Sequence, residues 1–142
     1  MKRNKLFFTF SNEEANHLIK ILNGHCIRYS KNCIPINVGD IVNNIGIVIR
    51  GSILNYTINP DNQQNIAISR IHSGGMLGII EIFTDELKFL CSSVIIDDAE
   101  ILYLDNPLTY IQEKYDATIV VFIKKLLNLF AEKLKKECVI TF

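Results

Sequence analysis

The chain has 142 residues, which is enough for one domain that buries its own core without disulfides or metals. The 15 Lys and Arg residues balance the 15 Asp and Glu residues, so net charge gives no reason to expect binding to nucleic acid or to a membrane surface. The hydrophobic content of 49% is at the upper end for a soluble domain and indicates an additional apolar surface between subunits.

No apolar run approaches the roughly 18 residues of a membrane helix, and the N-terminus lacks the apolar core of a signal peptide. We therefore expect a cytoplasmic protein with no membrane partner. The four cysteines form no C-x-x-C pair and no disulfide framework, so we expect small buried side chains rather than a metal site or a cofactor site. Metal ligation by two of them, Cys26 and Cys33, is the less favoured alternative. The cysteines are Cys26, Cys33, Cys91 and Cys138.

The first helix is predicted from Asn12 to about Leu22. Ser11 and Glu14 have the spacing of a capping box, in which each side chain accepts from the backbone N–H of the other residue. Apolar residues then recur at helical spacing. Asn23 and Gly24 end this helix.

From His25 to Ile96 the pattern changes to short β-branched runs separated by turns. Such spacing is typical of an antiparallel barrel or sandwich, so we expect a mainly β fold, an antiparallel β-roll with flanking helices. Gly46 and Gly51 lie inside the longest run and indicate corners or bulges. A turn is predicted at Asp97-Asp98. The predicted strands are 25–29, 33–36, 44–56, 64–72, 91–96 and 99–104.

A glycine-rich turn follows the fourth predicted strand. Gly74, Gly75 and Gly78 occur within five residues and lead directly into a short apolar segment ending at Phe83. A turn of this kind can bring several backbone N–H groups close to a ligand. The sequence therefore predicts the candidate binding site here.

Two helices are predicted at the C-terminal end. Asn106 and Pro107 have the residue types of an N-cap and a first helical position, and a longer helix should run from Ala117 to Lys136. Two apolar stripes lie along the longer helix, whereas a helix that packs only on its own domain needs one. We expect a homodimer through this helix, and the alternative is a helix sunk in a single core. The stripes are Ile119, Phe122, Leu126 and Leu129, and Ile123, Leu127, Phe130 and Leu134. The expected dimer residues are Ile119, Phe122, Ile123, Leu126, Leu129 and Phe130.

The order of these segments resembles the cyclic-nucleotide-binding-type sensor domain of Crp/Fnr transcription regulators. The segments that carry the resemblance are IGIVIRGSI (45–53), GGMLGIIEIF (74–83), AEILYLD (99–105) and LLNLFAEKL (126–134), within residues 6–137. It implies an effector-sensing and dimerisation domain, in which DNA is contacted only by a downstream helix-turn-helix domain. The alternative is a stand-alone interaction module.

The resemblance also implies an organisation of the chain. Residues 1–24 form an N-terminal helical segment, 25–105 the β-roll, and 106–137 the C-terminal helices. Residues 138–142 are expected to be a hinge toward a DNA-binding domain that this chain does not include, so the chain is expected to be part of a longer regulator.

Family members that bind cyclic AMP carry Gly-Glu in the turn and Arg-Ser or Arg-Thr about ten residues later. Here Ile79 follows Gly78, and Phe89 or Cys91 stands near the Arg position. A buried phosphate without Arg would be an unpaired charge, so we expect no binding of cyclic AMP or cyclic GMP, while an unknown effector remains possible. The residues expected around this degenerate phosphate cassette are Leu77, Gly78, Ile79, Glu81, Phe89, Cys91, Ser92, Ser93, Leu127 and Ala131.

An enzymatic site has little support in the sequence. A cupin-like metal enzyme needs two or three converging histidines, but His17, His25 and His72 are scattered and form no H-x-H pair. Ser92 and Ser93 have no nucleophile elbow around them. We therefore expect no catalytic residues and no enzymatic activity.

Overall fold

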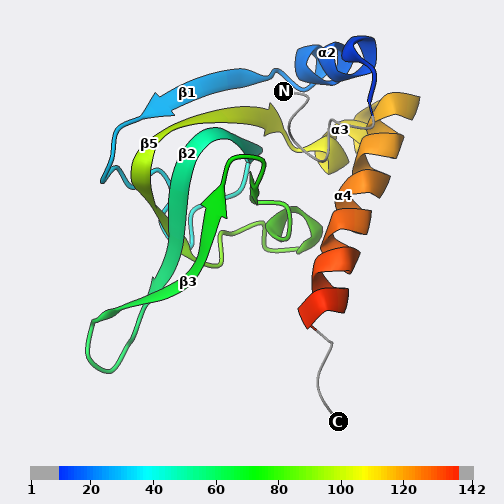
Figure 1. The fold of residues 1–142 in the computed structure, drawn as a ribbon. Coiled ribbons are helices and arrows are strands. Elements are labelled where there is room, and N and C mark those ends of the chain that lie inside the picture. The colour runs from blue at the N-terminus through cyan, green and yellow to red at the C-terminus, as the bar shows by residue number, and fades with distance from the viewer. Residues whose placement is uncertain (1–9, 138–142) are drawn as a thin grey trace.

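The computed structural model describes residues 10–137, which form a rolled antiparallel sheet with helices along one side (Figure 1). In that range no helix is both long and apolar enough to cross a membrane. The strands are β1 (His25–Tyr29), β2 (Asn44–Ile58), β3 (Asn65–His72), β4 (Met76–Leu77) and β5 (Ser92–Asp105). The helices are α2 (Asn12–Ile21), the short 3-10 helix η1 (Glu81–Phe83), α3 (Pro107–Glu113) and α4 (Ala117–Glu137).

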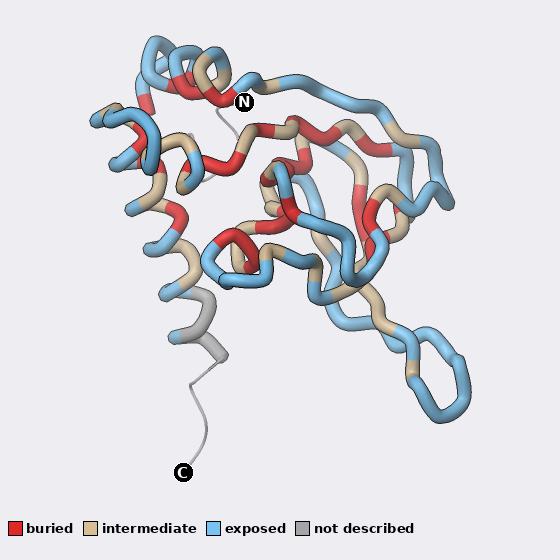
Figure 2. The backbone as a smooth tube through the Cα atoms, turned by 180° about the vertical axis from the view of Figure 1, so that it is seen from behind, coloured by how far each residue is buried: buried red, intermediate tan, exposed pale blue. Residues whose placement is uncertain are grey.

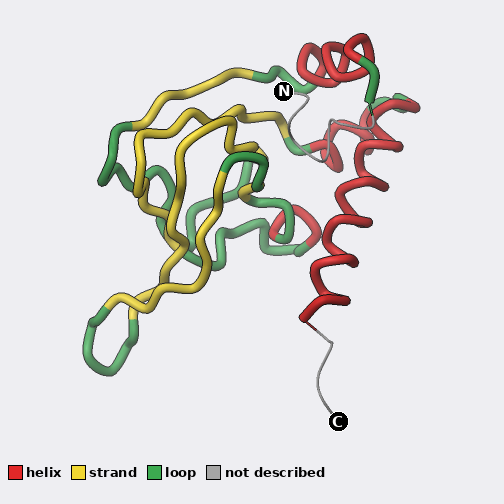
Figure 3. Tube along the Cα trace, viewed as in Figure 1, coloured by secondary structure: helices red, strands yellow, loops and turns green. Residues whose placement is uncertain are grey.

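The sheet has the strand order β1-β5-β2-β3, and β4 pairs with the first part of β2. All pairings are antiparallel. Figure 3 shows that the strands curl around one another rather than lying flat. The mainly β, antiparallel roll predicted from the sequence is confirmed, and the longest strands, β2 and β5, lie at its centre.

Two hydrophobic clusters hold the layers together, because successive residues of β2 and β5 point to opposite faces of the sheet. The larger cluster lies between the sheet and the helices, and the smaller one fills the interior of the roll. Figure 2 shows the buried residues concentrated between these layers, while the hairpin that joins β2 to β3 stands exposed. The larger cluster includes Leu18, Ile45, Ile47, Ile82, Leu102, Leu104, Ile119, Phe122 and Leu126. The smaller cluster includes Ile36, Val48, Ile53, Leu77, Ile95 and Ile101.

The bend of the sheet is concentrated around Gly51. Its φ is +88°, and the pairing of β2 with β5 is irregular on both sides of Arg50. The bulge expected at Gly51 is therefore confirmed. Gly46 forms no corner, because it pairs in regular register with Tyr103. A Cβ on Gly46 would lie 3.1 Å from Ile101 Cγ2, so this glycine allows close packing inside the roll.

The turn predicted at Asp97-Asp98 is wrong, because β5 continues through both residues. The partner strand absorbs the bend instead, and each carboxylate is bound in place. Asp97 Oδ2 accepts from Ser52 Oγ at 2.6 Å, and Asp98 Oδ1 accepts from the backbone N–H of Lys31 at 2.8 Å. The strand predicted over 33–36 is also wrong, because in that segment only an isolated bridge from Ile36 to Ser93 forms.

A Gly51→Ala substitution is expected to destabilise the fold by about 2–4 kcal/mol in urea denaturation. The added Cβ would lie 2.4 Å from the backbone oxygen of Asp98 and 2.6 Å from Ala99 Cα, neither of which can move without breaking β5. Gly39→Ala is the matched control, because Gly39 has a φ of +89° but open space around its Cβ position. If the two variants lose the same free energy of unfolding, the loss comes from the positive φ alone and not from the contact of the added Cβ with β5.

The helix ends follow the predicted capping chemistry. Ser11 Oγ accepts from the backbone N–H of Glu14 and Glu14 Oε1 accepts from that of Ser11, both at 3.1 Å, so the capping box is confirmed. Asn106 Oδ1 accepts from the backbone N–H of Leu108 and caps α3. The cap of α4 was not predicted. It is Asp116, whose Oδ1 accepts from the backbone N–H of Ile119 at 3.0 Å.

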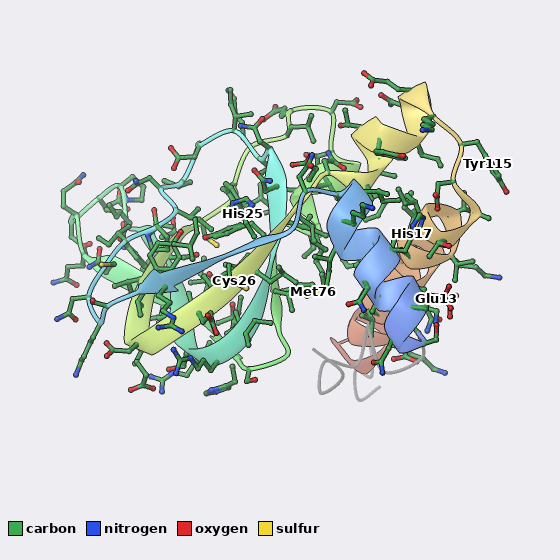
Figure 4. The ribbon with its side chains drawn as sticks, turned by 90° about the horizontal axis from the view of Figure 1, so that it is seen from above. Glu13, His17, His25, Cys26, Met76 and Tyr115 are labelled. Carbon is green, nitrogen blue, oxygen red and sulfur yellow. The ribbon has the colours of Figure 1, made fainter. Side chains whose placement is uncertain are left out.

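Asp116 also ties α4 to α2, since its Oδ2 lies 2.9 Å from His17 Nε2. The hydrogen bond from His17, together with backbone hydrogen bonds at the start of α4, holds the pKa of Asp116 below its usual value. Figure 4 shows His17 on the side of α2 that faces the loop carrying Tyr115. The first helix is thus fastened to the start of the long helix.

Candidate functional site

The long helix α4 packs on the roll through one of its two apolar stripes. Ile119, Phe122 and Leu126 are fully buried in the larger cluster. Ile82 of η1 belongs to the same cluster, and Ile79 packs against its edge. In Figures 1 and 3 η1 lies beside α4. The segment after the glycine turn and the long helix therefore contribute side chains to the same hydrophobic cluster.

This packing corrects part of the predicted dimer face. Ile119, Phe122 and Leu126 have no exposed surface in the single chain, so they cannot also form a contact with a second copy. Leu129 packs at the edge of the same cluster. The other stripe is more open. Ile123 and Phe130 are half-buried and Leu127 is 45% exposed, whereas the side chain of Leu134 lies outside the described part.

The glycine turn is held against β2 by its own backbone. The N–H of Gly74 donates to the carbonyl of Val48 at 2.8 Å, and the N–H of Val48 donates to that of Gly75 at 2.9 Å. Gly78 has a φ of +82°, and a Cβ there would lie 3.3 Å from the carbonyl oxygen of Asn44. The fold itself thus requires glycine at this position, whether or not a ligand binds.

The structure brings several predicted cassette residues together behind this turn. A Cβ on Gly78 would lie 3.5 Å from the ring of Phe89, and Glu81 Oε2 accepts from the backbone N–H of Leu90 at 3.4 Å. Leu77 is buried in the smaller cluster, where Phe89 also packs. The segments around Gly78 and Phe89 therefore form one packed unit.

The two serines of the cassette are already used by the protein. Ser92 Oγ accepts from the backbone N–H of Val38 at 2.8 Å. Ser93 Oγ donates to Asn55 Oδ1 at 2.7 Å, and the Asn55 amide donates in turn to Ser69 Oγ at 3.2 Å. The Ser93 bonds join β5, β2 and β3 across the sheet, and the Ser92 bond holds the loop at Val38. Both hydroxyls therefore make contacts within the fold, and the Ser93 O–H is used in its bond to Asn55.

The charges of the cassette also disfavour an anion. Glu81 is only 9% exposed, and Lys88 is the single cation between residues 74 and 93 and is exposed. Burial, followed by the nearby Glu81 carboxylate, raises the pKa of the Cys91 thiol, which keeps it in the uncharged form. A buried carboxylate without a buried cation does not fit a cyclic phosphate.

Two predicted pocket residues lie elsewhere. Leu127 and Ala131 are exposed, at about 100° and 140° around the helix axis from the buried Leu126. They face away from the roll of their own chain, so the prediction that they wall the cassette is wrong. The sequence shows two apolar stripes but does not show which of them the domain buries.

The cysteines and histidines form no ligand set. Cys26 and Cys33 are exposed, which contradicts their predicted burial, because Cys26 is on the outer face of the edge strand β1 and Cys33 lies in a loop. Cys138 lies outside the described residues. Within residues 10–137 no three His, Cys, Asp or Glu side chains gather as a metal site would require.

The structure contains a cleft that the sequence did not predict. It has a volume of about 260 Å³ and opens between the inner face of β1 and the loop that leads into β2. Phe89 is the single predicted pocket residue that lines it. The alternation of His25, Ile27 and Tyr29 along one face of β1 was the available signal, but its partners come from distant parts of the chain. The polar and aromatic lining residues are His25, Tyr29, Asp40, Asn43, Asn44, Phe89 and Tyr103.

Solved structures with this fold are regulators and nucleotide-binding domains. The catabolite activator protein of Thermus thermophilus matches with a TM-score of 0.74 and 19% identity over 93% of this chain. The N-terminal domain of a transcriptional regulator from Streptomyces coelicolor gives 0.73 and 13% over 98% of this chain and 94% of its own. The sensor domain of the regulator DNR from Pseudomonas aeruginosa gives 0.71 and 12% over 99% of this chain and 92% of its own.

These likenesses establish the fold, which this chain shares with the N-terminal domain from Streptomyces coelicolor and the sensor domain of DNR. This chain spans 59% of the length of the Thermus protein. No protein-family model and no curated protein sequence matches the chain.

Proposed function

We propose that this chain is the effector-sensing and dimerisation unit of a Crp/Fnr-type transcriptional regulator, and that it does not bind cyclic AMP or cyclic GMP. The observation that carries the proposal is the shared core of η1 and α4, because it couples the pocket side of the roll to the long helix. A ligand that moves η1 would shift α4 and thereby change the orientation of a domain that follows α4.

The open stripe of α4 supports dimerisation. Val120, Ile123, Leu127 and Phe130 are spaced by three, four and three residues, the repeat of a coiled-coil seam. Val120 is 41% exposed and Leu127 is 45% exposed, so apolar surface remains after α4 has packed on its own roll. We propose that these four residues contact a second copy. This dimer face omits Ile119, Phe122 and Leu126, which the sequence analysis included but which are buried in the single chain.

In the proposed role this chain itself neither contacts DNA nor catalyses a reaction. DNA would be contacted only by a domain after residue 142, and the hinge expected at 138–142 lies outside the described residues. The similarity to regulators and binding domains supports a protein without catalytic activity, acting in the cytoplasm. In this proposal residues 25–105 would act as the sensor and residues 106–137 as the dimerisation unit, with residues 1–24 as the N-terminal segment that precedes them.

Light scattering after size exclusion tests the dimerisation half of the proposal. At micromolar concentration we expect the mass of a dimer. A monomer would contradict the assignment of the open stripe. The regulatory half is tested by the coding sequence after residue 142, where a helix-turn-helix domain is expected and an unrelated domain would exclude a transcription factor.

The second candidate is an interaction module that senses no ligand. The contacts of the cassette favour this candidate, because Ser92 and Ser93 hydrogen-bond to other parts of the chain and Glu81 is buried. Thermal-shift measurements against a metabolite panel separate the two candidates. A stabilising compound supports the sensor, and the complete absence of a shift supports the module.

A further inference from the structure

The cleft beside β1 shares Phe89 with the phosphate cassette but has otherwise different walls. Its lining comes from the inner face of β1, from Tyr103 of β5, from the loop between Pro35 and Asn44, and from Phe89. The glycine turn and the cassette serines take no part in it. Ligands commonly bind at the mouths of small β-barrels, and this cleft lies at the open edge of the roll.

One wall of the cleft is a group of packed aromatic rings. The rings of His25 and Tyr103 stack with centroids 5.8 Å apart and planes 30° apart. Tyr29 meets Tyr103 edge-on at 6.5 Å, and their hydroxyl oxygens lie 2.8 Å apart. Burial, followed by the hydrogen bond with Tyr29, raises the pKa of Tyr103, so its hydroxyl stays protonated. The rings therefore form a packed aromatic surface on which a flat ligand can stack.

Polar groups in the cleft retain hydrogen-bonding capacity. In the tyrosine pair one hydroxyl donates to the other, which leaves one O–H as a donor for a ligand. His25 Nδ1 lies 3.1 Å from the carbonyl oxygen of Asn23, which can only accept, so Nδ1 donates to it and Nε2 makes no hydrogen bond within residues 10–137. Within residues 10–137 no group bonds to the side chain of Asn43. The cleft thus offers both donors and acceptors.

The charge of the lining selects against anions. Asp40 is the one formally charged side chain that lines the cleft, and no Lys or Arg does so. Its Oδ2 accepts from the backbone N–H of Asn37, which holds the loop in shape. Ile27 and Ile41, at 37% and 65% exposed, leave apolar surface uncovered at the rim. A ligand that is flat, apolar on its faces and rich in nitrogen at its edge matches all of these features.

We propose that this cleft binds a small planar aromatic molecule with ring or substituent nitrogens, neutral or cationic and without an anionic group. The ring would stack on the Tyr103 side and the nitrogens would face Asp40 and Asn43. The proposal goes beyond the regulatory role above and does not depend on it, because the same cleft would exist in a monomeric interaction module.

Adenine and benzamidine are the probes, and benzoate is the anionic counterpart of benzamidine. In two-dimensional NMR titrations of the full chain we expect dissociation constants of about 1 mM or tighter for at least one of the two probes. The shifted amides should lie in residues 25–29 and 40–44 rather than 76–83. Benzoate should bind at least about fivefold more weakly than benzamidine, because it meets the Asp40 carboxylate.

Two variants and two matched controls locate the site. Asp40→Asn keeps an acceptor for the backbone N–H of Asn37 but removes the charge. It should lower the affinity for benzamidine at least about fivefold. Tyr29→Phe keeps the ring and removes a hydroxyl, and it should lower the affinity for adenine. Asp61→Asn in the exposed hairpin and Tyr115→Phe at the start of α4 should change neither affinity. The proposal is overturned if neither probe binds, if benzoate equals benzamidine, if the shifts fall in 76–83, or if the cleft variants bind as the controls do.

Discussion

A Leu127→Glu substitution is expected to convert the dimer into a monomer, with at least a 100-fold (~2.7 kcal/mol) loss of dimer affinity. Leu127 is 45% exposed and lies in the middle of the open stripe, between Ile123 and Phe130. In a symmetric pair the substitution introduces two carboxylates into one apolar contact, since each copy contributes its own. Sedimentation over a range of concentrations measures the change.

The neighbouring residue provides the control for this variant. Asn128→Glu adds the same charge one position along the helix, on an exposed side that does not belong to the stripe. It should remain a dimer, and both variants should keep the circular dichroism of the parent chain. Loss of the dimer in both variants, or in neither, would show that the contact with the second copy does not run along this stripe.

A Phe122→Ala substitution is expected to lower the free energy of unfolding by about 3–5 kcal/mol. Phe122 has no exposed surface, its ring lies 6.4 Å from that of Phe10, and it joins α4 to the sheet in the larger cluster. Its removal leaves a cavity between helix and roll that surrounding backbone cannot fill. Urea denaturation followed by circular dichroism gives the value.

Val121→Ala tests whether this loss comes from the buried contact. Val121 is the adjacent residue of the same helix and is 43% exposed. Its truncation should change stability by less than about 1 kcal/mol. If Phe122→Ala costs no more than Val121→Ala, then α4 does not pack on the roll in solution as it does in this fold.

Features encoded by neighbouring residues could be predicted from the sequence. The capping box at Ser11 and Glu14 and the start of α3 at Asn106 are examples, because side chain and backbone partner lie within three residues of each other. The continuation of β5 through Asp97 could not be predicted. That carboxylate is bound by Ser52, 45 residues away, and the bend is taken by Gly51 on the partner strand.

The features of the candidate site also differ in whether they could be predicted from the sequence. The absence of Arg and the presence of Ile79 after Gly78 are visible in the sequence, and the prediction that cyclic nucleotides do not bind rests on them. The engagement of Ser93 by Asn55 could not be predicted, since it depends on the register between β5 and β2. The cleft beside β1 combines Tyr29, Asp40 and Tyr103, which only the rolled sheet brings together.

Calorimetric titration of cyclic AMP and cyclic GMP into the chain shows whether the glycine-turn cassette binds a cyclic phosphate. The cassette holds the buried Glu81 carboxylate, and its serine hydroxyls are bound within the sheet. The account predicts no binding heat for either nucleotide up to about 1 mM. Saturable binding with a micromolar dissociation constant would contradict it.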